Sequence, residues 1–85
     1  SYPGPYARTF IKNKEYAIIN SELTNYNTEE KFLPGEIASI EREGNIIKTA
    51  DGFLFLREMA EVGESDALKQ AFCPKFDIGT KFSER

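Results

Sequence analysis

The sequence predicts a mostly β fold, a small and partly open barrel of five or six short strands with one short helix. Short apolar runs recur along the chain, turn-forming residues separate them, and only one stretch shows helical spacing. A chain of 85 residues forms one domain, and it buries about 60–65% of its unfolded surface. We therefore expect residues 1–85 to be a single domain whose size leaves no room for an elaborate interior active site.

A hairpin is expected at the start of the fold. Residues 8–11 and 15–19 are apolar or β-branched in large part, and the polar residues 12–14 between them make a connection of hairpin length. Two prolines and a glycine within residues 1–6 predict a structured turn that leads into this hairpin.

The next part of the chain predicts a loop and then a third strand. Polar residues dominate positions 20–32, which indicates a loop. Residues 36–41 predict a strand, but Ile37 and Ile40 are three positions apart, which breaks strict alternation. Such spacing predicts a β-bulge or a strand buried on both faces.

Two further strands follow across short turns. Gly44-Asn45 leads into residues 46–49, and Asp51-Gly52 is a strong hairpin signal before residues 53–56. Because residues 53–56 are apolar on both faces, we expect this strand to lie in the middle of the sheet.

The C-terminal third predicts the helix and a closing segment. Residues 65–72 start with a capping serine and carry apolar residues at i, i+3 and i+4 spacing, and Pro74 ends the pattern. Cys73 is a lone cysteine beside apolar neighbours, so we expect it to be buried. Residues 76–82 predict a short closing strand or extended segment.

The order of these motifs resembles the C-terminal domain of the methionyl-tRNA formyltransferase and sugar N-formyltransferase family. The resemblance rests on Tyr-Pro-Gly-Pro-Tyr at residues 2–6, Pro-Gly-Glu-Ile at 34–37, the glycine turn, apolar strand and Asp-Gly of 44–52, and Ile-Gly-Thr-Lys-Phe at 78–82. One departure is Thr49-Ala50, where the family often has Ala-Cys-Gly. The resemblance implies an open six-stranded barrel of OB-like topology.

The resemblance also implies an accessory role beside a catalytic formyltransferase domain that precedes this one in the same chain. That domain carries an Asn-His-Asp set and uses a formyl-tetrahydrofolate donor, whereas no cofactor is expected here. Because the 85 residues contain no histidine, neither that set nor a Ser-His or Cys-His pair can be assembled from them. We therefore assign no catalytic and no metal-binding residue.

Basic residues on or beside the predicted strands are interleaved with aromatic ones, as in OB-type barrels that bind nucleic acid. Acidic residues lie among them, which is also typical of a mixed, solvated surface. The candidate substrate-binding residues are Arg8, Arg42, Lys48 and Arg57. Lys12 and Lys14, in the connection of the first predicted hairpin, are two further cations beside predicted strands.

The acceptor of the formyl group is less defined. With 14 acidic against 11 basic residues and a net charge of −3, we expect a small amino-sugar nucleotide rather than tRNA. Two other functions remain open, a stand-alone OB-like module for single-stranded nucleic acid and an interaction or oligomerisation domain.

The cellular setting follows from composition. No apolar run approaches the about 20 residues that cross a bilayer, so no membrane association is expected. A single cysteine indicates a reducing compartment, and we expect a cytoplasmic protein. Because the chain begins with Ser1, we also expect that it is a piece of a longer polypeptide.

Overall fold

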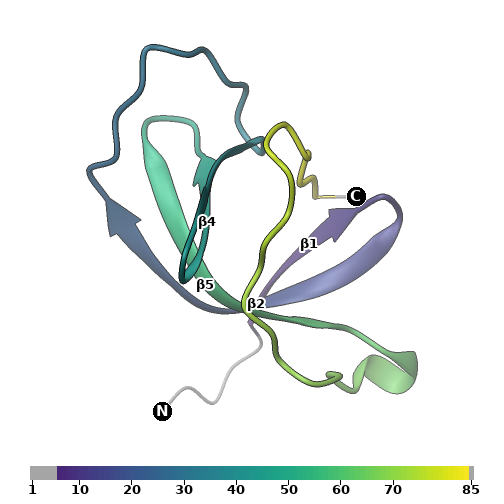
Figure 1. Ribbon diagram of the computed structural model, residues 1–85. Coiled ribbons are helices and arrows are strands. Elements are labelled where there is room, and N and C mark those ends of the chain that lie inside the picture. The colour runs from purple at the N-terminus through teal and green to yellow at the C-terminus, as the bar shows by residue number, and fades with distance from the viewer. Residues whose placement is uncertain (1–5, 85) are drawn as a thin grey trace.

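The computed structural model describes residues 6–84, and its strands form one antiparallel sheet (Figure 1). The order across the sheet is β1-β2-β5-β4-β3. The mostly β fold class is therefore confirmed, with five strands rather than six in the described residues. The strands are β1 (Ala7–Ile11), β2 (Lys14–Thr24), β3 (Ile37–Glu41), β4 (Gly44–Lys48) and β5 (Phe53–Glu61).

The first hairpin forms where the sequence predicts it. Ile11 pairs with Lys14, so Lys12 and Asn13 alone make the turn, with φ of 52° and 72°. Two successive positive φ values match the right-handed twist of a two-residue hairpin. The structured turn expected over residues 1–6 lies, except for Tyr6, outside the described residues.

The loop expected at residues 20–32 is wrong in its first part, because β2 continues to Thr24. Residues 20–24 pair with β5 and stay in the sheet although most of them are exposed. Their polar composition therefore reflects solvent on the strand rather than a loop. The connection to β3 begins after Thr24 and projects beyond the end of the sheet (Figure 1).

β5 is the central strand, as predicted, and pairs with β2 on one side and β4 on the other. Its Leu56 and Met59 are fully buried in the core. The phenylalanines Phe53 and Phe55 are partly buried on the opposite face of the strand. The bulge predicted in the third strand is also confirmed, because the β3–β4 register shifts between Ile37 and Ser39.

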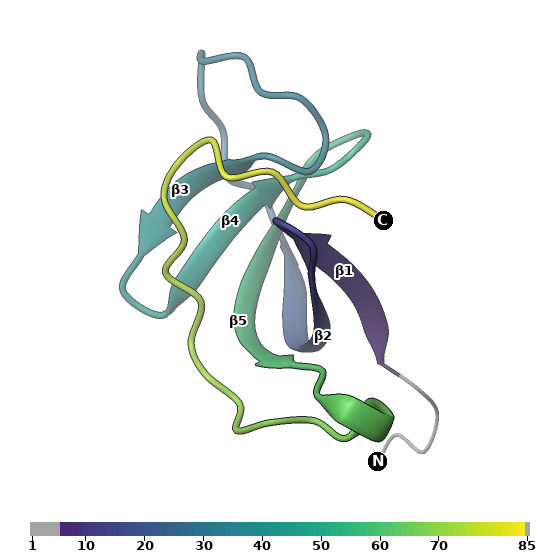
Figure 2. The same cartoon turned by 90° about the vertical axis from the view of Figure 1, so that its right-hand side faces the viewer.

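The segment at residues 80–83 closes the barrel by bonding to both outer strands of the sheet. Phe10 and Ser83 exchange two backbone hydrogen bonds of 2.8 and 3.0 Å at β1. On the other side, the N–H of Ile37 donates to the carbonyl of Thr80 at 2.9 Å. Figure 2 shows this segment in yellow, passing beside β3 and β4 before it turns towards β1. The predicted closing segment is therefore present as isolated bridges rather than as a regular sixth strand.

The helix expected over residues 65–72 is wrong. The structure has one short 3-10 turn, Glu64–Asp66, and then an extended chain. The reason is that β4 reaches only as far as Leu56 along β5, which leaves the later part of β5 with an unpaired edge. Phe72 occupies that edge, exchanging backbone hydrogen bonds of 2.7 and 2.9 Å with Met59. A sheet edge thus outweighs the weak local helix pattern.

The burial expected for Cys73 is also wrong, since its side chain is exposed. In the extended segment, side chains alternate between the two sides, so Phe72 and Pro74 turn inward and Cys73 turns outward. The prediction of burial depended on the helix that does not form.

The core lies between the concave face of the sheet and the C-terminal segment. Tyr16, Phe72 and Phe76 pack against it from the edge, with edge-to-face ring contacts at centroid distances of 6.0 to 6.2 Å. The central cluster consists of Ile11, Ile37, Ile47, Leu56, Met59 and Phe82.

Of residues 6–84, none belongs to a helix that could traverse a lipid bilayer.

Candidate functional site

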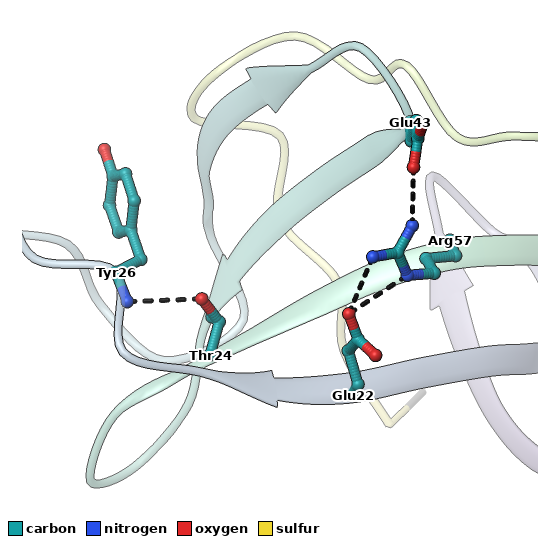
Figure 3. Close-up of polar contacts among 5 residues, drawn as sticks. All are labelled: Glu22, Thr24, Tyr26, Glu43 and Arg57. Carbon is teal, nitrogen blue, oxygen red and sulfur yellow. Dashed lines mark hydrogen bonds and ion pairs between the residues drawn. The ribbon is translucent and has the colours of Figure 1, made fainter.

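Arg57, one of the four predicted binding cations, is held by two carboxylates (Figure 3). Its Nε and Nη2 donate to Glu22 at 3.1 and 2.7 Å, and its Nη1 donates to Glu43 at 2.8 Å. The guanidinium carbon also lies 4.4 Å from the centroid of the Phe55 ring. The hydrogen bonds to Glu22 and Glu43 raise the pKa of Arg57 above its ordinary value. The ion pairs of Arg57 therefore link its own strand, β5, to β2 and to the β3–β4 turn.

Lys48 is likewise engaged within the domain. Its Nζ donates to the carbonyl of Thr49 at 2.7 Å and to that of Gly52 at 3.4 Å. The same ammonium lies 5.3 Å from the centroid of the Phe53 ring. Lys48 thus fastens the loop between β4 and β5.

Arg8 and Arg42 differ in their surroundings. Arg8 Nη1 donates to Glu15 at 3.0 Å and lies 3.8 Å from an Asp66 carboxylate oxygen. Arg42 is exposed in the β3–β4 turn and has no hydrogen-bond or ion-pair partner among residues 6–84.

The sheet does not bring these four cations into one cluster. Lys48 pairs with Phe53 at one end of the β4–β5 ladder, whereas Arg57 follows the last pair at the other end. Arg8 lies on the outer strand β1, on the far side of β2 from β5. Arg8 and Arg57 are paired with acids, and Lys48 is bound by backbone carbonyls, so the four cations make no continuous basic surface.

A pocket of about 460 Å³ lies instead between the β1–β2 hairpin and the C-terminal segment. Three lysines line it: Lys12 from the hairpin turn, Lys14 from the start of β2, and Lys75 from the segment that crosses the sheet. The sequence places Lys75 more than sixty positions away from the other two. The fold therefore creates a local positive charge on a chain whose net charge is −3.

The other walls of the pocket are mixed. Tyr16, Phe76 and Ile11 supply aromatic and aliphatic surface, and Asp77 and Thr80 supply oxygen atoms. The rings of Tyr16 and Phe76 meet edge to face with centroids 6.0 Å apart. Pockets for small organic ligands generally combine apolar walls with a few polar groups in this way.

Asn45 holds one wall of the pocket in place. It is fully buried, its Oδ1 accepts the N–H of Phe76 at 2.8 Å, and its Nδ2 donates to the carbonyl of Phe76 at 3.1 Å. A second bond from Nδ2 reaches the carbonyl of Ser39 at 3.1 Å. Because both backbone groups of Phe76 are bound, the backbone that carries the neighbouring Lys75 and Asp77 is held at the rim.

The lysines of the pocket are only partly compensated. Lys14 Nζ lies 3.8 Å from Glu61, and that carboxylate also lies 3.5 Å from Lys69. Lys12 and Lys75 have no ion-pair or hydrogen-bond partner among residues 6–84. Exposed ammonium groups of this kind are available to an anion from outside the domain.

Metal binding has no counterpart in the described part of the chain. Between residues 6 and 84, no group of three or more His, Cys, Asp or Glu side chains lies close enough together to hold an ion. Of the paired acids in the sequence, Glu29 and Glu30 are exposed. Glu41 accepts a hydrogen bond from Ser39, and Glu43 binds Arg57.

Comparison with known proteins identifies the domain. A family model described as the formyl transferase C-terminal domain matches residues 1–73. The chain belongs to this family. The resemblance noted from the turns and strands is therefore confirmed, and the closing residues 80–83 lie beyond the matched range.

The similar curated proteins are methionyl-tRNA formyltransferases. One from Mycoplasma capricolum is 33% identical over 63 residues, which cover 73% of this chain and 20% of that protein. One from Ruminiclostridium cellulolyticum is 28% identical over 57 residues, 67% of this chain and 18% of that protein. The matched part of the chain thus spans about a fifth of the length of these relatives. No solved structure matches the chain.

The sequence reasoning found two lysines of the pocket and missed the third. Lys12 and Lys14 stood out as cations of the first hairpin, but Lys75 lay in a stretch assigned to the end of a helix and a proline stop. Asn45 and Thr80 stood out only as parts of a turn and of a family motif, because only the path of the C-terminal segment brings them to this pocket.

Proposed function

We propose that residues 1–85 are the C-terminal domain of a methionyl-tRNA formyltransferase, and that this domain holds the tRNA acceptor for a catalytic domain that precedes it in the same polypeptide. The observation that carries the proposal is the family match over residues 1–73 together with relatives more than three times as long. The transfer of the formyl group takes place on the preceding domain.

The names of the relatives favour tRNA over a small amino-sugar nucleotide, and the local charge removes the objection drawn from the net charge. The preference for an amino sugar rested on the net charge, and the names of the relatives do not support it. A polyanion responds to the local arrangement of lysines rather than to the sum of charges. Lys12, Lys14 and Lys75 supply such an arrangement at one pocket.

The formyl donor, a formyl-tetrahydrofolate, belongs to the preceding domain in this proposal. The chain has no histidine to accept a proton from the attacking amino group at neutral pH. Its own residues therefore bind and orient, and the cations Arg8, Lys48 and Arg57 keep the barrel and its loops in shape.

Titration of the 85-residue chain with two acceptors tests the proposal. Binding of a methionine initiator tRNA in the micromolar range, with a nucleotide-linked amino sugar at least tenfold weaker, is the expected result. The salt concentration must be stated and matched, because phosphate contacts weaken with salt. Tighter binding of the amino sugar, or no binding of tRNA at millimolar concentration, would overturn the assignment of the acceptor.

A further inference from the structure

The pocket between the first hairpin and the C-terminal segment has the chemistry of a nucleotide site. We propose that it takes one nucleotide of the bound nucleic acid, with a phosphate on Lys12, Lys14 and Lys75 and the attached sugar or base against Tyr16 and Phe76. This inference rests on the proposed function, because it names the part of the acceptor that this pocket contacts.

We infer the phosphate part of the ligand from the three ammonium groups at the pocket. Lysine binds phosphate as a compact point charge with three donors, and two of these lysines have no partner within residues 6–84. Lys14 Nζ lies 3.8 Å from the Glu61 carboxylate, which also pairs with Lys69. Because 60% of the Lys14 side chain is exposed, it can turn towards an anion. The pocket therefore offers more positive charge than its own acids cancel.

We infer the sugar or base of the ligand from the apolar residues that line the rest of the pocket. An inorganic anion would use only the lysines, whereas Tyr16, Phe76 and Ile11 present apolar surface to whatever fills the remaining volume. A volume of about 460 Å³ exceeds what one phosphate needs and falls in the range of pockets for small organic ligands. OB-type barrels bind single-stranded nucleic acid through aromatic side chains that lie beside basic ones.

Asp77 and Thr80 restrict the ligand further. A carboxylate on the rim repels a second phosphate and accepts a hydrogen bond from a hydroxyl or an exocyclic amino group. The Thr80 hydroxyl can donate or accept. This combination fits one phosphodiester with its ribose and base better than a run of phosphates.

The backbone holds the lysines at this pocket. Lys12 has a φ of 52°, a conformation that side chains rarely adopt and that is often retained at functional positions. Asn45 fixes Phe76, so Lys75 is anchored one residue away from a doubly bound backbone unit. Both lysine positions are therefore set by the fold rather than by mobile loops.

A matched pair of charge reversals tests the site in the 85-residue chain. Lys75→Glu changes the pocket, and Lys31→Glu makes the same change of charge at an exposed loop residue that has no partner among the described residues. For a tRNA transcript, Lys75→Glu is expected to weaken binding about tenfold and to reduce the salt slope by about one, and Lys31→Glu less than about threefold. Circular dichroism of both variants, compared with that of the wild type, checks that they keep the β fold.

A second readout uses adenosine 5′-monophosphate, followed by amide chemical shifts of the wild-type chain. Shifts confined to Lys12, Lys75, Thr80 and their neighbours support the site. If tRNA binds the wild type but both reversals weaken it equally and the mononucleotide shifts no pocket amide, the pocket assignment is wrong and the proposed function stands. If tRNA does not bind but the mononucleotide shifts the pocket, the acceptor is wrong and the pocket is right. If neither binds, both are wrong.

Discussion

Lys12 places its ammonium at the pocket from a backbone conformation that glycine adopts more easily. Left-handed φ costs a residue with a side chain about 1–2 kcal/mol relative to glycine. We expect Lys12→Gly to raise the free energy of unfolding by up to about 1 kcal/mol, which corresponds to about 4–8 °C in Tm for a domain of this size. Thermal unfolding followed by circular dichroism measures the shift.

Lys14→Gly is the matched control for this variant. Lys14 lies in the regular strand β2, where glycine costs about 0.5–1 kcal/mol, so its Tm is expected to fall. Both variants lose one pocket lysine and should bind tRNA more weakly. A lower Tm for Lys12→Gly than for the wild type would show that the turn carries no strain.

Gly44 is the residue whose replacement the backbone resists most. Its φ is 148°, and a Cβ atom there would overlap the carbonyl oxygen of Leu56 on the neighbouring strand. We expect Gly44→Ala to lower the free energy of unfolding by about 3 kcal/mol or more, because β4 and β5 must separate to admit the methyl group. Urea denaturation gives the difference.

Gly79 offers the comparison. Its φ is 91°, but no atom lies within 4 Å of the position that a Cβ would take. Gly79→Ala should therefore cost only the backbone strain, about 1–2 kcal/mol. Equal losses for the two alanine variants would contradict the role given to the β4–β5 contact.

Among the elements, the closing segment at residues 80–83 determines whether the sheet becomes a barrel. Phe82 carries its main apolar contact, being 6% exposed with its ring 5.6 Å from that of Phe76. We expect Phe82→Ala to cost about 3–5 kcal/mol, a large part of the stability of a domain this small. Urea denaturation of the variant tests this.

Ile78→Ala is the control for that prediction. Ile78 lies two residues before that segment and is 57% exposed, so its truncation should change stability by less than about 0.5 kcal/mol. If Phe82→Ala were as mild as Ile78→Ala, the segment would lie on the barrel without closing it.

Most strands and turns could be predicted because their signals are local, but the turn expected at Gly44-Asn45 is wrong: Glu41 pairs with Gly44, so Arg42 and Glu43 make the turn. The hairpin at Lys12-Asn13, the bulge near Ile37 and the central place of β5 each follow from alternation and turn residues within a few positions. The extent of β2 could not be predicted in this way, because residues 20–24 are polar and stay extended only through their pairing with β5.

The C-terminal third was predicted least well, for one physical reason. Residues 68–72 have helical spacing, but the unpaired edge of β5 gives their backbone groups partners that the sequence does not reveal. The prediction that Cys73 is buried was wrong because it depended on that helix. Lys75 was not recognised as a pocket residue because only the fold brings it close to Lys12.

At the scale of the whole molecule, the positive charge is local and the net charge is negative. Glu22 and Glu43 surround Arg57 on one part of the sheet, while Lys12, Lys14 and Lys75 gather at the pocket. Each of the three pocket ammonium groups should displace about one counterion from the tRNA on binding. We therefore expect log Kd for tRNA to rise with log salt concentration with a slope of about 2 to 3.

Affinity measured at four salt concentrations between about 50 and 200 mM gives this slope, since phosphate contacts are strongly weakened over that range. A slope near zero would mean that the contacts are not electrostatic. A slope well above the number of pocket lysines would mean that a broader surface, including Arg8 or Arg42, takes part.

The central claim is that this domain contributes binding of the acceptor and none of the chemistry. The most direct measurement is the rate of formyl transfer by the 85-residue chain, supplied with a formyl-tetrahydrofolate and methionyl-tRNA at concentrations where binding of the tRNA is saturated. The account predicts bound tRNA with no formylation above the rate without protein. Formylation by the chain alone, or an absence of tRNA binding under these conditions, would contradict it.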